Sequence, residues 1–137
     1  MLTLLIVTEN PSTRFWVQTH LKDQFFVLTA ERRKEAVEAL SSQLDFIIIE
    51  ESCEDALDLC KELSRLTKRE LVPILLITGK LKKSFRNQAA ASGVTGFVSD
   101  QLDLDEFQTI IQAGLKAAAA RQKTTHSATQ SLKPRNK

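Results

Sequence analysis

Residues 44–52, with the sequence LDFIIIEES, decide the fold of this chain. The segment is apolar at every position from 46 to 49, and it ends abruptly on Glu50 and Glu51. A strand exposed on one face would alternate apolar and polar residues, so a continuous apolar run indicates a strand buried on both faces. Because aromatic and β-branched residues favour strands, we expect this segment at the centre of a sheet.

Several other short apolar runs also stop on acids or hydroxyls, and helical spacing of apolar residues fills the segments between the runs. Alternation of strand and helix indicates right-handed crossovers, a parallel sheet and a three-layer α/β sandwich. The expected strands are residues 2–7, 25–30, 46–50, 74–77 and 95–99, and the expected helices are residues 11–23, 31–41, 55–66, 81–92 and 103–120.

Acidic residues follow three of these strands. The carboxyl ends of parallel strands lie at one edge of the sheet, where open α/β folds bind ligands. We therefore expect Glu9, Glu50 and Asp100 around one shallow acidic site. Neighbouring carboxylates repel one another unless a cation lies between them, and Lys80, two residues after Thr78, is the nearest candidate in the sequence. The alternative is that these acids are ordinary solvated side chains.

The length of 137 residues fits one domain, and 42% apolar with 26% charged residues is typical of soluble globular proteins. Residues 121–137 carry five basic and no acidic side chains, whereas the rest has 14 basic and 17 acidic ones, a net charge of −3. We expect a domain at residues 1–120 and a disordered basic tail or linker at 121–137. The domain offers no basic stripe for nucleic acid, so nucleic acid would contact only the tail or an absent output domain. Acidic lipid would contact only the tail, and we expect no other association with a membrane.

The two cysteines point to a reduced, cytoplasmic protein. Cys53 and Cys60 lie about two helical turns apart, roughly 10 Å, which exceeds disulfide reach. Cys60 is expected in the core and Cys53 in a loop open to solvent. We find no His or Cys spacing typical of a metal site, no glycine-rich phosphate loop and no nucleophile elbow. The apolar start at residues 2–7 is too short to be a signal peptide or to span a membrane.

Four segments in register resemble the receiver domain of two-component response regulators, which has a CheY-like (flavodoxin-like) fold. The resemblance covers residues 2–118, and it implies a five-stranded parallel sheet of order 2-1-3-4-5 with five helices. The segments are LLIVTENPSTR (4–14), LDFIIIEES (44–52), PILLITGK (73–80) and SGVTGFVSDQLDLDEF (92–107).

The resemblance implies a set of site residues. A receiver holds Mg²⁺ with an acidic pair after its first strand and accepts phosphate on an aspartate that ends its third strand. A threonine or serine after the fourth strand and a lysine after the fifth contact the phosphoryl group, and an aromatic residue completes the switch. The matching positions here are Thr8 and Glu9 for the acidic pair, Glu50 for the acceptor, Thr78 and Phe97 for the switch, and Asp100 for the lysine.

These departures predict a pseudo-receiver that acts without phosphorylation. An aspartate in place of the lysine turns an attraction into a repulsion, each worth about 1 kcal/mol at 4 Å in water and about 4 kcal/mol near a protein surface. We expect no enzymatic activity and no cofactor beyond weak divalent binding at Glu9 and Glu50. Either Glu50 imitates a phosphorylated acceptor or the pocket has decayed and the fold serves as a scaffold. We favour the scaffold, because one carboxylate copies a phosphoryl group poorly.

Two other functions stay open from the sequence: a phosphorylatable receiver, and the regulatory half of a DNA-binding regulator. In the resembling family, the face built from the fourth helix, the fifth strand and the fifth helix carries output and dimer contacts. Opposite charges on the two helices of that face would suit a protein partner or a two-fold homodimer, although ordinary solvated faces look the same. The residues concerned are Lys82, Lys83 and Arg86 on one helix and Asp105, Glu106 and Gln108 on the other.

Overall fold

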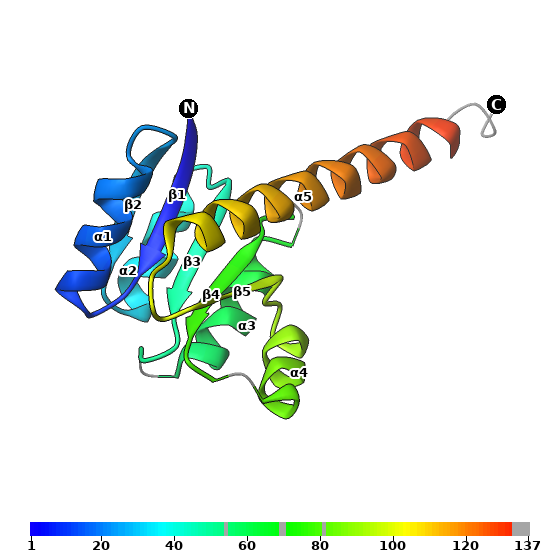
Figure 1. Ribbon diagram of the computed structural model, residues 1–137. Helices are drawn as coiled ribbons and strands as arrows, with labels where there is room; N and C mark the ends of the chain where they lie inside the picture. Colours follow the sequence, from blue (N-terminus) through cyan, green and yellow to red (C-terminus); the bar gives the residue numbers. More distant parts are fainter. Residues whose placement is uncertain (54, 69–70, 81, 133–137) are drawn as a thin grey trace.

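The computed structural model describes residues 1–53, 55–68, 71–80 and 82–132, with side chains to residue 121. It is the expected three-layer sandwich, and its parallel sheet has the order β2-β1-β3-β4-β5 (Figure 1). The strands are β1 (Leu2–Val7), β2 (Phe25–Ala30), β3 (Phe46–Glu50), β4 (Ile74–Thr78) and β5 (Gly96–Ser99). The helices are α1 (Pro11–Leu21), α2 (Arg33–Glu38) with a following 3-10 turn η1 (Ala39–Ser41), α3 (Ala56–Leu66), α4 (Lys83–Ala91) and α5 (Leu104–Leu132).

The strand β3 lies at the centre of the sheet, as its composition predicts. It pairs with β1 on one side and with β4 on the other, and all five of its residues are buried. Ile47 and Ile49 pack on one face against α2, α3 and α4, while Phe46 and Ile48 pack on the other against α1 and α5. Burying each of these side chains contributes about 1.5–3 kcal/mol.

Local sequence signals set the ends of two helices. The Asn10 side chain accepts a hydrogen bond from the backbone N–H of Ser12, and Pro11 takes the first helical position of α1. Gly93 has φ +97° and ends α4, a conformation that favours glycine. The expected helix at 31–41 divides into α2 and η1, and α4 begins at Lys83 instead of residue 81, which lies outside the described residues.

The last helix is longer than predicted. We expected it to end at Ala120 and a disordered tail to follow, but α5 continues to Leu132 and extends past the sheet (Figure 1). Its four consecutive alanines at 117–120 favour helix, and neither glycine nor proline occurs between Gly114 and Pro134 to stop it. The remainder of the predicted tail, 133–137, lies outside the described residues. None of the helices in the described ranges is long and apolar enough to cross a membrane.

Candidate functional site

Glu50, at the acceptor position, is a buried carboxylate held by two hydroxyls. It ends β3 and is 9% exposed. One carboxylate oxygen accepts a hydrogen bond from Thr8, and the other accepts one from Thr13 at 2.9 Å. A buried charge needs such donors, and hydrogen bonds to charged groups contribute about 1.5–3 kcal/mol each. The acceptor position is therefore an internal hydrogen-bonded group, joined to β1 and α1.

Thr8 is fixed in place by its own main chain. Its N–H donates to the carbonyl of Ala30 at 2.9 Å, which extends the β1–β2 ladder by one residue. Its hydroxyl oxygen accepts the N–H of Asn10 at 3.0 Å. Thr8 stands where the resembling family has one of its two metal-binding acids. Here a hydroxyl at this position donates to Glu50, and a carboxylate ligand is missing.

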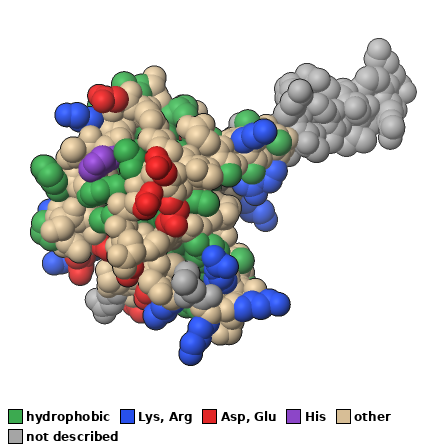
Figure 2. Space-filling model, in the orientation of Figure 1, with side chains coloured by type: hydrophobic (Ala, Val, Ile, Leu, Met, Phe, Trp, Pro, Cys, Tyr) green, Lys and Arg blue, Asp and Glu red, His purple; other side chains and the backbone are tan. Residues whose placement is uncertain are grey.

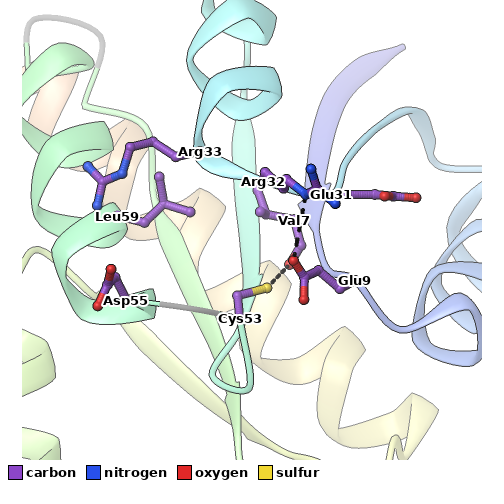
Figure 3. Close-up of a pocket in the computed structure, with 8 residues that line it drawn as sticks. All are labelled: Val7, Glu9, Glu31, Arg32, Arg33, Cys53, Asp55 and Leu59. Carbon is purple, nitrogen blue, oxygen red and sulfur yellow. Dashed lines mark hydrogen bonds and ion pairs between the residues drawn. The ribbon is translucent and has the colours of Figure 1, made fainter.

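Glu9 lies on the other side of this edge, in a pocket of mixed charge. Its carboxylate is 3.9 Å from Nε of Arg32, and both side chains are more than half exposed. The pocket has a volume of about 480 Å³ (Figure 3), and two more of its charged residues form ion pairs, Glu31 with Arg14 and Arg33 with Glu62. It is lined by Val7, Glu9, Glu31, Arg32, Arg33, Cys53, Asp55 and Leu59.

Asp100, at the lysine position, lies against the loop between β4 and α4. A Cβ placed on Gly79 would be 2.6 Å from Oδ2 of Asp100, so the glycine leaves room for the carboxylate. Within the described residues, no group of three or more His, Cys, Asp or Glu side chains could hold a metal ion. The structure thus places Glu9, Glu50 and Asp100 along one edge without gathering them into a metal-binding cluster.

Lys80 does neutralise an acid at this edge, but the acid is Glu51. The Lys80 Nζ lies 3.3 Å from Glu51 Oε2 and 5.2 Å from the centre of the Phe85 ring. The Thr78 hydroxyl accepts the Lys80 N–H at 2.9 Å and donates to Glu51 Oε1 at 3.4 Å. These contacts connect the β4–α4 loop to the β3–α3 loop, and they direct the switch hydroxyl to Glu51.

Residues of the predicted interaction face are exposed on α4 but partly engaged on α5. Lysine and arginine side chains gather over α4, and acids gather over the start of α5 on the same face of the molecule (Figure 2). The Arg86 guanidinium lies 5.5 Å from the centre of the half-buried Phe97 ring. Glu106 accepts the N–H of Ser99 at 2.6 Å, so this acid joins α5 to β5. Lys82, Lys83 and Asp105 are exposed, and Gln108 is half-buried.

Both thiols are buried, so the expectation that Cys53 faces solvent is wrong. Its Sγ lies 3.5 Å from the carbonyl oxygen of Val7 (Figure 3), and burial raises its pKa, with smaller contributions from the charges of Glu50 and Glu9. Burial raises the pKa of Cys60 to about 12. A thiol with a raised pKa is a weak nucleophile, and neither cysteine is a candidate reactive group.

Two residues of the site were not among its predicted members. Thr13 shares the buried stripe of α1 with Val17 and Leu21, at spacings of four residues. A polar residue on such a stripe needs a buried partner, and that requirement could have identified it. Glu51 could not be identified from the sequence, because its pairing with Lys80 depends on how two loops meet and leaves no periodic signal.

Comparisons with known proteins agree with this architecture. No protein-family model matches the chain. The structure resembles the chemotaxis protein CheY4 of Vibrio cholerae with a TM-score of 0.77 and 24% identity, covering 84% of this chain and 99% of that one. It also resembles the signal receiver domain of an HD domain-containing protein from Pseudomonas fluorescens Pf-5, with a TM-score of 0.79, 16% identity, and coverage of 89% and 92%.

Two larger proteins match over a small part of their length. NtrX from Brucella abortus aligns with a TM-score of 0.82 and 16% identity over 92% of this chain and 29% of its own. A curated protein of Formosa agariphila, named Histidine kinase P4, is 24% identical over 113 residues. The chain covers only 8% of the length of that protein, and the match covers 80% of this chain. At these identities, the likenesses to solved structures establish that the chain has a CheY-like fold.

Proposed function

We propose that this chain is a receiver-like signalling module of the two-component type that works through protein contacts and not through aspartyl phosphorylation. The observation that carries the proposal is the condition of Glu50. Its carboxylate is buried, and both of its oxygens accept hydroxyl hydrogen bonds. An acceptor of phosphate has to present an oxygen to the donor beside a metal ion and a cation. Both carboxylate oxygens of Glu50 are instead occupied by hydrogen bonds from the hydroxyls of Thr8 and Thr13.

The residues around the acceptor position support the same conclusion. Asp100 brings negative charge to the lysine position, where it would repel an incoming dianion. Lys80 is 60% exposed at its side chain and pairs with Glu51. In this proposal the module works without catalysis and without a cofactor. Weak binding of Mg²⁺ at Glu9 and Glu50 stays a prediction, which calorimetric titration with the metal alone would check.

Within this proposal, a scaffold is favoured over a permanent mimic of the phosphorylated state. A mimic has to direct its negative charge to the switch hydroxyl. The Thr78 hydroxyl contacts Glu51 and the Lys80 N–H, while the oxygens of Glu50 contact Thr8 and Thr13. The charge of Glu50 is therefore used to fasten β3 to α1.

Beryllofluoride, an analogue of the acyl phosphate, tests the proposal together with Mg²⁺. Amide NMR spectra of the chain are expected to show no saturable shift at Thr78 or Phe97. The control is the triple variant Thr8→Asp, Glu50→Asp and Asp100→Lys, which restores the receiver residue types and is expected to bind the analogue. Saturable binding by the unaltered chain, with shifts at both switch positions, would mean that the pocket is a working phosphorylation site.

We further infer that a protein partner with an acidic surface docks on α4, in the cytoplasm. Lys83 and Arg86 on this helix and Lys82 directly before it are exposed, and charge complementarity steers such encounters. Reversing all three charges to glutamate is expected to abolish capture of the partner by the immobilised chain. Reversing the exposed Lys61, Arg65 and Lys68 on and after α3 is the matched control, and it is expected to leave capture unchanged. Equal loss in both variants would refute a specific site on α4.

A further inference from the structure

The outer edge of β2 carries main-chain groups that face away from the sheet. In the order of the described sheet, β2 is a terminal strand and pairs with β1. The carbonyl of Ala30 accepts the N–H of Thr8, so the main-chain groups of Ala30 point to β1. Because this direction alternates along a strand, the N–H and C=O groups of Phe25, Val27 and Thr29 point to the open edge.

This edge lacks the features that usually prevent strands from pairing. Natural edge strands are protected by lysine, proline, bulges or short length. The sequence of β2, FFVLTA, contains none of those residues, and its six residues pair with β1 in unbroken register. The residues flanking the strand are Lys22 with Asp23 at its start and Glu31 with Arg32 at its end. Each end therefore carries one charge of each sign, and neither end repels a strand that approaches.

An apolar patch lies beside the same edge. Phe15 is 70% exposed, Phe26 is 62% exposed and Met1 is 84% exposed. Single exposed apolar residues are common, but three that line one groove beside an open strand edge mark an interaction surface. A shallow groove contains all three, and its lining is Met1, Phe15, Gln18, Thr19, Lys22, Phe25, Phe26 and Val27.

We propose that a second copy of this chain covers this edge, with the two β2 strands paired antiparallel across a two-fold axis. Outward-pointing residues have to meet one another to form hydrogen bonds, and a two-fold axis makes the contact self-complementary. An axis at Val27 satisfies both conditions. Val27 then faces Val27 of the second copy, and Phe25 faces Thr29 of the second copy. Three outward N–H donors from each copy give six hydrogen bonds between the strands.

The same register covers the most exposed ring of the strand. Phe26 and Leu28 point to the sheet face opposite to Val27, because side chains alternate along a strand. Pairing about Val27 places Phe26 opposite Leu28 of the second copy, which is partly buried against the core cluster under α2 and α3. Phe15, on α1, lies in the groove with Phe25 and Val27 on the other face. Both sides of the new strand pair would therefore be apolar.

The area available suits a small and reversible dimer. An aromatic side chain buries about 150–250 Å², so Phe15 and Phe26 each still expose on the order of 100–150 Å². Four rings from two copies supply roughly a third of the ~1,600 Å² of a standard interface, and the strand edges with Met1 and Lys22 have to supply the rest. The dimer is thus expected at the lower end of the size range, with association that depends on concentration. It leaves α4 free, because α4 lies toward the opposite end of the sheet (Figure 1).

Sedimentation velocity of the full chain, from about 1 μM to about 1 mM, measures this association. The unaltered chain is expected to shift from monomer to dimer. Phe26→Lys places a charge in the contact, and Thr29→Pro removes an outward N–H without disturbing the pairing with β1. Each is expected to weaken the dimer at least tenfold while the circular dichroism of the monomer stays unchanged. Leu66→Lys, at another exposed leucine, is the matched control and is expected to keep the dimer.

Cross-linking tests the register directly. Residues directly opposite in a hydrogen-bonded pair have Cα atoms about 5.5 Å apart, within disulfide reach. Val27→Cys is therefore expected to form a disulfide-linked dimer under mild oxidation, whereas Thr29→Cys is not. A chain that is monomeric at every concentration would overturn the proposal. Dimers that survive both Phe26→Lys and Thr29→Pro, or that are lost on reversing Lys82, Lys83 and Arg86, would also overturn it. None of these results bears on phosphorylation, so this inference and the proposed function fail separately.

Discussion

Thr13 and Glu50 are joined by a hydrogen bond of 2.9 Å between a threonine hydroxyl and a buried carboxylate. The bond connects the first turn of α1 to the end of β3, and Thr8 donates to the other carboxylate oxygen. At the edge where the resembling family collects metal ligands, this chain has replaced a carboxylate by a donor. The acceptor position has thereby become part of the internal packing of the domain.

Thr13→Val is expected to destabilise the domain by about 1–3 kcal/mol, because it removes a donor from a buried charge at nearly constant volume. Denaturant unfolding measures the change. Glu50→Gln in the Thr13→Val background tests the assignment, since the coupling energy between the two positions is expected to be at least about 0.5 kcal/mol. Strictly additive losses would mean that the Thr13 hydroxyl does not support Glu50.

Gly93→Ala is expected to cost about 2 kcal/mol or more, because a side chain at positive φ is strained. A Cβ at this position would also clash with the Ser64 Cβ, which α3 holds in place. Thermal unfolding should show the same loss of stability in Gly93→Ala alone and in Gly93→Ala combined with Ser64→Ala. The alanine at position 64 keeps the Cβ that obstructs the new side chain. Full rescue by Ser64→Ala would assign the strain to the hydroxyl instead.

Lys80→Ala is expected to lower the unfolding free energy by less than about 1 kcal/mol, because the Lys80 side chain is 60% exposed and its ion pair with Glu51 is screened by water. The difference from the unaltered chain should shrink at ~1 M salt, where the Debye length is about 3 Å. Amide shifts at Thr78 are expected to move, since its hydroxyl contacts both partners. An unchanged Thr78 signal would make Lys80 a surface residue without influence on the switch position.

Alkaline pH is expected to destabilise the domain through Cys60. Burial raises the pKa of the Cys60 thiol from its ordinary value of 9.0 to about 12 in the folded chain, so the thiol keeps its proton to higher pH there than in the unfolded chain. The resulting stability is present below pH 9 and is lost as the pH rises toward 12. The loss is about 1.4 kcal/mol per pH unit in that window.

The Cys60→Ala variant supplies the reference for this pH dependence. Lysines also titrate at alkaline pH, and they do so in the variant as well as in the unaltered chain, so the difference between the two reports on Cys60. Urea unfolding of both chains between pH 8 and pH 11 is expected to show a steeper decline in the unaltered chain. Parallel curves would indicate that Cys60 ionises equally in the folded and unfolded states.

Most of the fold could be predicted because its signals are local. The continuous apolar run at 46–49 identified the central strand, and the helical spacing of apolar residues between the runs identified the helices that cover the sheet. The length of α5 could not be predicted from composition, because the polar, basic sequence after Ala120 is typical of disorder. The helix can continue because its alanines favour helix and no glycine or proline occurs between Gly114 and Pro134.

The site was predictable at the level of which residues share an edge, and not at the level of which residues touch. Glu50 ends β3, Thr8 directly follows the neighbouring strand β1, and their side chains do meet. Glu9 instead pairs with Arg32, and Lys80 pairs with Glu51. Which partner a charged side chain pairs with depends on its rotamer and on the exact path of the loops. Neither leaves a regular spacing in the sequence from which it could be predicted.

Intact-mass spectrometry after incubation with acetyl phosphate and Mg²⁺ tests the central claim most directly. The triple variant Thr8→Asp, Glu50→Asp and Asp100→Lys is the control. It checks that acetyl phosphate and Mg²⁺ can phosphorylate this fold under the conditions used. The unaltered chain is expected to gain no phosphoryl group while the control gains one. An acid-labile phosphoryl group on Glu50 of the unaltered chain would contradict the account.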